Sequence, residues 1–179
     1  MGRILLLTGT PGIGKTTVIQ RAAYELVKRG FKVGGMITRE VREKGTRIGF
    51  EIEDLSTRRK GWLAHVNQPV GPKISKYRVN LKDLEDIGVK AIQDAIAKSD
   101  IIIVDEIGPM ELFSQAFKDS VVKALNSKKP VLGTIHYRAK GYFIESVKKR
   151  SDVELIKVDF QNRNRLPLLI VEKILNQNK

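Results

Sequence analysis

The stretch GTPGIGKTT, from Gly9 to Thr17, constrains the fold more than any other part of the chain. It fits the pattern G-x-x-x-x-G-K-S/T at every fixed position and lies between the apolar run Ile4–Leu7 and a helical pattern that starts at Val18. Glycines let the backbone fold tightly, so that successive N–H groups converge on phosphate oxygens at the positive end of the following helix. The sequence therefore predicts a phosphate-binding loop between a strand and a helix.

Within this loop, three side chains have separate expected roles. Lys15 is expected to reach the β- and γ-phosphates, and Thr16 to bind Mg²⁺ through its hydroxyl. Thr17 is expected either to cap the helix or to contact the α-phosphate. The residues predicted here to bind a nucleotide are Gly9, Thr10, Pro11, Gly12, Ile13, Gly14, Lys15, Thr16 and Thr17.

Composition narrows the class of protein. A chain of 179 residues with 41% hydrophobic residues suits one domain over 1–179. No apolar run approaches the ~20 residues that span a bilayer, and the start lacks the features of a signal peptide, so we expect a soluble, cytoplasmic protein with no membrane partner. With no Cys and two His, the chain excludes disulfides and a cysteine nucleophile and does not favour zinc. The expected metal is Mg²⁺ that arrives with a nucleotide.

The net charge of +13 is unevenly distributed. Lys and Arg outnumber Asp and Glu by 13 to 6 in residues 1–60 and by 13 to 5 in residues 121–179, whereas the middle has 7 against 9. Attraction of polyanionic nucleotides together with a solvated lysine surface is favoured over nucleic-acid binding, because there is no long basic run and no aromatic-rich RNA-binding motif. The sequence leaves the oligomeric state open, with a monomer slightly favoured.

Strand-like and helix-like segments alternate along the chain. Strands are expected over 31–41, 48–55, 61–66, 77–79, 101–104, 130–136 and 154–160, and helices over 17–29, 81–98, 113–126, 142–150 and 163–176. Asn80 is expected to cap the second of these helices, and Gly34-Gly35 to mark a bulge or a close backbone approach. This order predicts an α/β fold with a mostly parallel sheet, helices on both faces and an antiparallel insert at roughly 41–80.

The pair Asp105-Glu106 supplies the acids that a phosphate loop needs for catalysis. Asp105 ends the apolar strand Ile101–Val104, as a Walker-B acid does, and is expected to support Mg²⁺ together with Thr16. Glu106 is placed to polarise the water that attacks the γ-phosphate. These two residues therefore predict a hydrolytic site.

The strand that ends in Gly133-Thr134-Ile135-His136 is expected between the phosphate-loop strand and the Asp-Glu strand. Its polar end could then sense the γ-phosphate or hold the attacking water. Thr134 is the favoured residue for this catalytic role, and His136 is equally compatible with an ordinary loop position.

An arginine beyond Lys15 is expected to neutralise charge in the transition state. Arg39, Arg42, Arg47 and Arg138 all lie in loops or at strand ends, and the sequence does not choose among them. Arg42, which lies with Arg47 in the hairpin turn, is the arginine predicted to be catalytic.

The segment Gln161–Arg165 is expected to open the last helix. Asn162 and Arg163 could bind a nucleobase by hydrogen bonding or stacking, and they could equally be capping and surface residues.

Five segments together resemble one known family. They are TGTPGIGKTT, ITREVREKGTRIGFEI, VDEIGPMELFS, VLGTIH and NRNRL, which span nearly the whole chain. The chain resembles the small nucleoside triphosphatases of thermophiles, called cancer-related nucleoside triphosphatases in vertebrates. The resemblance implies slow, Mg²⁺-dependent hydrolysis of several nucleoside triphosphates to the diphosphate and phosphate. It also implies a RecA-like variant of the P-loop fold, in which Gly9–Thr17 bind phosphates, Asp105 supports Mg²⁺ and Glu106 is the base.

Two other functions are compatible with the same loop. A nucleotide or small-molecule kinase would use the insert 41–80 as an acceptor pocket, and an ATPase stimulated by nucleic acid would use the basic ends of the chain. Nucleic acid is the less favoured partner. Base preference, pathway and any activating partner are not determined by the sequence.

Overall fold

One mixed sheet of nine strands organises the molecule, in the order β5-β6-β4-β3-β2-β7-β8-β1-β9. The computed structural model describes residues 3–176. The strands are β1 (Ile4–Thr8), β2 (Val33–Glu43), β3 (Thr46–Asp54), β4 (Lys60–His65), β5 (Lys73–Ile74), β6 (Tyr77–Val79), β7 (Ile101–Ile107), β8 (Val131–Ile135) and β9 (Val153–Lys157).

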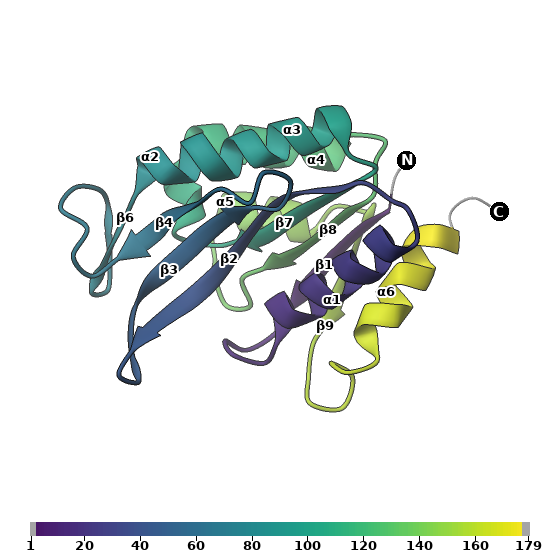
Figure 1. The fold of residues 1–179 in the computed structure, drawn as a ribbon, viewed down its shortest axis with the longest axis horizontal. Coiled ribbons are helices and arrows are strands. Elements are labelled where there is room, and N and C mark those ends of the chain that lie inside the picture. Colours follow the sequence, from purple (N-terminus) through teal and green to yellow (C-terminus); the bar gives the residue numbers. More distant parts are fainter. Residues whose placement is uncertain (1–2, 177–179) are drawn as a thin grey trace.

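Helices cover both faces of this sheet (Figure 1). They are α1 (Lys15–Lys28), α2 (Leu81–Asp83), α3 (Lys90–Lys98), α4 (Gln115–Asn126), α5 (Tyr142–Lys148) and α6 (Leu166–Leu175), with a π-helix over Leu84–Val89 and a 3₁₀ turn over Glu111–Phe113. Helices α1 and α6 pack side by side on one face, while α2 to α5 lie over the other. The result is the three-layered α/β fold that the sequence predicts.

The parallel part of the sheet consists of β2, β7, β8, β1 and β9. Strands β1 and β7 are apolar almost throughout because helices cover them on both faces. Strand β8 lies between them, which confirms the expected RecA-like order. The carboxyl ends of β1, β7 and β8 therefore meet at one edge, where ligands of open α/β sheets bind.

The antiparallel part begins with β2, which pairs with β7 on one side and with β3 on the other. Strands β3, β4, β6 and β5 extend the sheet outward, which confirms the predicted antiparallel addition; the short strand β5 was not predicted. Gly35 lies at the junction of the two parts with φ +116°, and an added Cβ would be 2.0 Å from the Ile103 carbonyl oxygen. The Gly34-Gly35 pair thus marks a close backbone approach.

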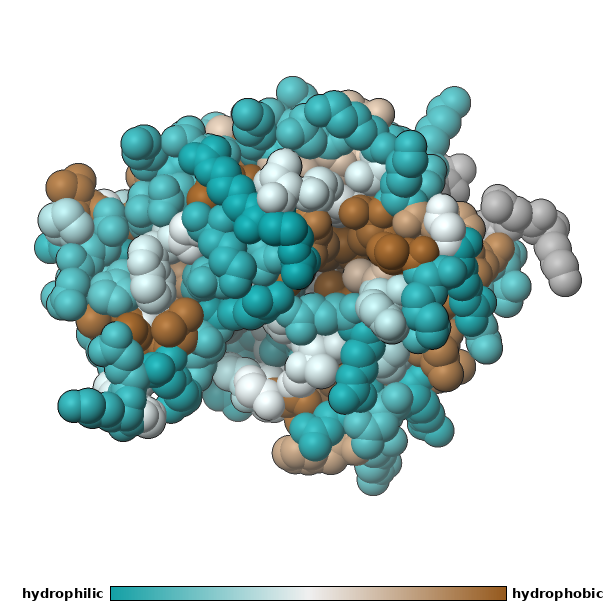
Figure 2. Space-filling model, viewed as in Figure 1, coloured by the Kyte–Doolittle hydropathy of each residue, from teal (hydrophilic) through white to brown (hydrophobic). Residues whose placement is uncertain are grey.

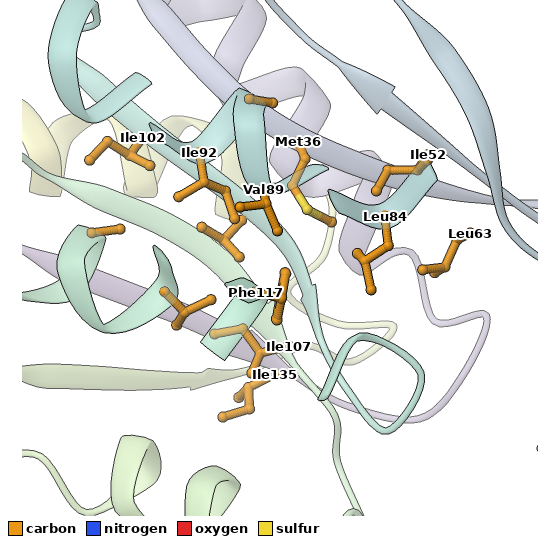
Figure 3. Packing of buried hydrophobic residues seen from close by; sticks show 14 of the residues in the cluster. Met36, Ile52, Leu63, Leu84, Val89, Ile92, Ile102, Ile107, Phe117 and Ile135 are labelled. Atoms are coloured by element: carbon orange, nitrogen blue, oxygen red, sulfur yellow. The ribbon is translucent and has the colours of Figure 1, made fainter. Parts of the chain in front are cut away.

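Two apolar cores lie on opposite faces of the sheet. The larger one packs the helices α3, α4 and α5 on the strands, and Figure 3 shows Met36, Ile52, Leu84, Ile92 and Phe117 among its side chains. The other joins α1 and α6 to the sheet through residues such as Ile19, Leu26 and Ile170. These cores hold the strand ends rigidly, as a site built from several strands requires.

Two boundaries differ from the sequence prediction. The helix expected over 81–98 does begin at Leu81 and is capped by Asn80, whose side chain accepts a hydrogen bond from the Asp83 N–H, but a π-helix interrupts it at Leu84–Val89. The last helix begins at Leu166 rather than at 163, because Asn162 and the residues after it form turns held by Asp159. The expectation that Gln161–Arg165 opens this helix is therefore wrong.

The visible surface is mostly hydrophilic, and hydrophobic residues gather where α1 and α6 lie (Figure 2). The large exposed hydrophobic residues of these helices are Tyr24, Val27, Leu168 and Leu169. Within residues 3–176, no helix combines the length and the apolar character that crossing a membrane requires.

Candidate active site

The loop between β1 and α1 has the conformation that its glycines predict. Gly14 precedes the first residue of α1 with φ +109°, a value that L side chains rarely adopt. The helix begins at Lys15, so the prediction that Thr17 caps it is wrong; contact of Thr17 with an α-phosphate stays a prediction. The Lys15 ammonium donates to the carbonyl oxygens of Gly9 and Thr10 at 2.8 and 3.1 Å.

Asp105 lies opposite this loop and is 1% exposed. Its carboxylate accepts hydrogen bonds from the Thr16 hydroxyl at 2.8 Å, from the Thr134 hydroxyl at 2.6 Å and from the Thr38 backbone N–H. Burial nevertheless raises the pKa of Asp105 to about 6, because these neutral donors offset only part of the cost of removing a charge from water.

Asp105 and Thr16 fit a magnesium ion. Mg²⁺ prefers hard oxygen ligands and binds proteins through one or two carboxylates together with phosphate oxygens and water. Within residues 3–176, no Lys, Arg or His nitrogen lies within 4.0 Å of the Asp105 carboxylate. The buried charge therefore lacks a cation that a metal ion would supply.

Two further carboxyl groups follow Asp105 along the chain. Burial raises the pKa of Glu106, and the ammonium of Lys15 opposes this shift. Burial, with repulsion from Glu106 and then Asp105, raises the pKa of Glu111 well above its ordinary value. Glu106 thus lies in the low-dielectric, lysine-facing environment in which a carboxylate can act as a base near neutral pH.

A cavity of about 810 Å³ connects these groups. The phosphate loop, Asp105, Glu106 and Glu111 line one end of it. The opposite end reaches the antiparallel part of the sheet, where its lining includes Arg47, Phe50, Leu63 and Ile74. The cavity therefore extends beyond the phosphate loop to the strands of the antiparallel part.

Thr134 lines the cavity at the end of β8, as expected, whereas Arg42 does not line it. The only hydroxyl proton of Thr134 is donated to Asp105, so this side chain positions the acid. Arg42 is bonded to Glu40 and to the Gly45 carbonyl oxygen in the hairpin, and is not among the residues that line the cavity. The geometry gives no support to a catalytic role for Arg42, whereas Arg39, Arg47 and Arg138 do line the cavity.

Asn162 and Arg163 are engaged with the protein itself. The Asn162 side chain accepts from the Asp159 N–H and donates to the Lys157 carbonyl oxygen, as a turn residue does. The Arg163 guanidinium donates to the Ile13 carbonyl oxygen at 3.2 Å and lies over the Phe160 ring, 4.8 Å from its centre. Arg163 therefore stabilises the phosphate loop through this hydrogen bond. Binding of a nucleobase by Asn162 or Arg163 stays a prediction.

Sequence reasoning missed Glu111, although DEIGPMELF had marked its segment as distinctive. A third carboxylate six residues after Asp105 was the available signal. It also missed Phe50 and Tyr137 in the cavity lining, for which the sequence offers no comparable signal.

Comparison with known proteins identifies the family. The model of a family described as NTPase matches residues 4–171 of this chain. The chain belongs to this NTPase family. Nucleoside-triphosphatase THEP1 of Thermofilum pendens is 49% identical over 170 residues, covering 94% of this chain and 93% of the relative. Its counterpart in Methanosarcina acetivorans is 43% identical, covering 97% of each.

Solved structures of the family share the fold. A human cancer-related nucleoside triphosphatase is 33% identical, with a TM-score of 0.83 over the full length of both chains. THEP1 of the hyperthermophile Aquifex aeolicus is 26% identical with a TM-score of 0.84, covering 96% of this chain and 98% of that one. These comparisons confirm the family that the sequence motifs predicted.

Proposed function

We propose that this member of the NTPase family hydrolyses nucleoside 5′-triphosphates to the diphosphate and phosphate with the aid of Mg²⁺. The observation that carries the proposal is the contact of the Thr16 hydroxyl with Asp105 at 2.8 Å, which joins the phosphate loop to the acidic strand end. The relatives named nucleoside-triphosphatase support the same reaction. The cytoplasm is the proposed compartment.

Each residue at this end of the cavity has a proposed part. The N–H groups of Gly9–Thr17 hold the phosphates, and the Lys15 ammonium leaves its carbonyl partners for phosphate oxygens. Thr16 and Asp105 hold Mg²⁺, which when bound neutralises charge on the phosphate oxygens. Glu106 takes a proton from water as the water oxygen bonds to the γ-phosphorus and the bond to the bridging oxygen breaks.

The proposed site favours a broad choice of nucleotide. The groups that face the phosphates are backbone N–H groups, Lys15 and Thr16, and phosphates are common to every triphosphate. We therefore expect ATP, GTP, CTP and UTP all to be hydrolysed.

Phosphate release from these four triphosphates, with Mg²⁺ and with EDTA, tests the proposal. Glu106→Gln is expected to retain nucleotide binding and to lower kcat by about 10²- to 10⁴-fold. Lys15→Ala is expected to weaken binding of triphosphate itself. Wild-type protein that binds ATP and GTP without releasing phosphate would refute hydrolysis, and full activity in Glu106→Gln would remove the base assignment.

A second candidate function is phosphoryl transfer to a small acceptor. The far end of the cavity favours it, because Arg47, Phe50 and Ile74 line space beyond the phosphate loop. Incubation with ATP and a panel of nucleoside monophosphates separates the two reactions. Formation of the diphosphate from the acceptor faster than free phosphate would make transfer the main activity.

A further inference from the structure

His136 follows directly after β8, which ends at Ile135, and lies two residues beyond Thr134. Its backbone N–H donates to the Ile107 carbonyl oxygen at 3.0 Å, past the irregularity that shifts the register of β7 and β8 between Val104 and Ile107. His136 and the phosphate loop line the same cavity.

The orientation of this imidazole is determined by its own loop. Nδ1 accepts hydrogen bonds from the backbone N–H of Ala139 at 2.9 Å and of Arg138 at 3.3 Å. A ring nitrogen that accepts carries no proton, so the neutral ring carries its proton on Nε2. Within residues 3–176 no group bonds to Nε2, which leaves this N–H as a donor for a ligand.

The loop that carries His136 is anchored from the neighbouring helix. The ammonium of Lys148 on α5 donates to the carbonyl oxygens of His136 and Tyr137 at 3.0 and 3.3 Å. Burial, together with the positive charges of Lys15 and Lys148, lowers the pKa of His136. A lower pKa favours the neutral ring, in which the proton is on Nε2 because Nδ1 accepts hydrogen bonds.

Lys15 and His136 line the same cavity. Lys15 is the residue proposed to meet the β- and γ-phosphates, so a triphosphate bound there would lie in the cavity that His136 lines. Thr134 has no proton left for a ligand, since its hydroxyl proton is donated to Asp105. His136 is thus the donor from β8 that is free to meet the terminal phosphate.

We propose that His136 is a catalytic residue whose Nε2–H donates a hydrogen bond to a γ-phosphoryl oxygen. The proposal rests on the hydrolysis proposed above. A donor held ready by its own loop stabilises the charge that develops on the transferred phosphoryl group without having to reorganise. It also distinguishes a triphosphate from a diphosphate, because only the triphosphate reaches it.

His136→Asn and His136→Gln separate this role from a structural one. The asparagine carboxamide oxygen lies where Nδ1 does and can accept from Arg138 and Ala139, but the side chain is too short to place a donor at Nε2. Glutamine is long enough to place its NH₂ group there. We expect His136→Asn to lower kcat by about 10²-fold, and His136→Gln to be more active than His136→Asn.

Binding measurements complete the test. For His136→Asn we expect affinity for a non-hydrolysable triphosphate to fall about 5-fold or more while affinity for ADP stays within about 2-fold of wild type. Wild-type kcat in this variant, or equal losses for the two nucleotides, would overturn the proposal. If wild-type protein releases no phosphate, the proposed hydrolysis fails, and the ratio of triphosphate to ADP affinity still decides whether His136 contacts the γ-phosphate.

Discussion

Two buried carboxylates, Asp105 in the parallel part of the sheet and Glu53 in the antiparallel part, have opposite surroundings. Each residue is 1% exposed. Glu53 has Arg58 at 3.0 Å, Arg39 at 3.2 Å and Lys60 at 3.8 Å, in ion pairs whose angles are not those of hydrogen bonds. The carboxylate of Asp105 instead accepts hydrogen bonds from two hydroxyl groups and one backbone N–H.

This difference separates a carboxylate compensated within the protein from the one that we propose to be functional. A buried charge is costly unless another charge compensates it. The protein supplies the compensating cations for Glu53, whereas Asp105 keeps a raised pKa and depends on a cation from outside. Within residues 3–176, Asp105 is buried with neutral hydrogen-bond donors and no ion pair, since the charge of Lys15 acts on it only from beyond 4.0 Å, and this supports the metal site proposed for Thr16 and Asp105.

The largest effect on stability is expected from Gly35→Ala, which would disrupt the pairing of β2 with β7, where the parallel and antiparallel parts of the sheet meet. An added Cβ would lie 2.0 Å from the Ile103 carbonyl oxygen, so β2 and β7 could not keep their pairing. We expect a loss of about 4 kcal/mol or more in the free energy of unfolding, measured in urea. Gly45→Ala is the control, because Gly45 also has positive φ but nothing within 4 Å, and should cost about 1 kcal/mol. Similar losses would contradict the role given to Gly35.

Asp105→Asn is expected to stabilise the protein while abolishing its proposed activity. The pKa of Asp105 is about 6 against an ordinary 3.8, a difference that corresponds to about 3 kcal/mol at pH 7. Urea unfolding in EDTA should show a gain of that order, and Mg²⁺-dependent phosphate release should fall about 10²-fold or more. A loss of stability would show that Asp105 is compensated within the protein.

The same residue predicts a pH dependence. Folded Asp105 binds its proton more tightly than the unfolded chain, so its destabilising contribution is complete above about pH 6 and disappears as pH falls toward 3.8. In EDTA, the stability difference between Asp105→Asn and wild type should therefore shrink from about pH 7 to pH 4. Thermal unfolding of the two proteins at a series of pH values measures it, and a constant difference would contradict the prediction.

Glu53→Gln should change stability in the opposite direction. Neutralising this residue leaves Arg39 and Arg58 without their counter-charge, but their side chains are 40% and 70% exposed and water compensates part of the loss. We expect a loss of about 1–2 kcal/mol in urea unfolding. A gain like that of Asp105→Asn would remove the distinction between the two carboxylates.

The smallest effect is expected from Arg42→Ala. Arg42 pairs with Glu40 at the hairpin while its side chain is 56% exposed, and such pairs contribute about 0–1 kcal/mol. Phosphate release should stay within about twofold of wild type, because Arg42 does not line the cavity. A large fall in kcat with unchanged stability would instead restore the catalytic role predicted from the sequence.

The alternation of apolar runs and helical patterns was enough to predict the sheet with its helices and the antiparallel addition. Local signals also placed the cap at Asn80 and the crowding at Gly35. The π-helix at Leu84–Val89 and the late start of α6 were not predictable in this way, because packing on the sheet and the turn at Asp159 decide them.

The sequence could not show which polar side chains line the cavity with a free donor, because this depends on hydrogen-bond partners that are distant in sequence. Arg47 rather than Arg42 reaches the cavity, and the Arg47 guanidinium is held by the Tyr77 hydroxyl from β6, 30 residues away. Thr134 rather than His136 was favoured as the sensor, yet Thr134 donates to Asp105. Neither pairing leaves a local pattern in the sequence.

The sequence by itself was enough to predict the phosphate-binding loop, since nine consecutive residues from Gly9 to Thr17 carry the backbone freedom, the lysine and the hydroxyl that phosphate binding needs. It also determined which strand end carries the acids. Only the tertiary structure decided that Asp105 is buried with no ion pair among the described residues while Glu53 has three, and that Nδ1 of His136 accepts from the backbone of its own loop. Burial and the direction of a hydrogen bond arise from contacts across the sheet, and these exist only once the chain is folded.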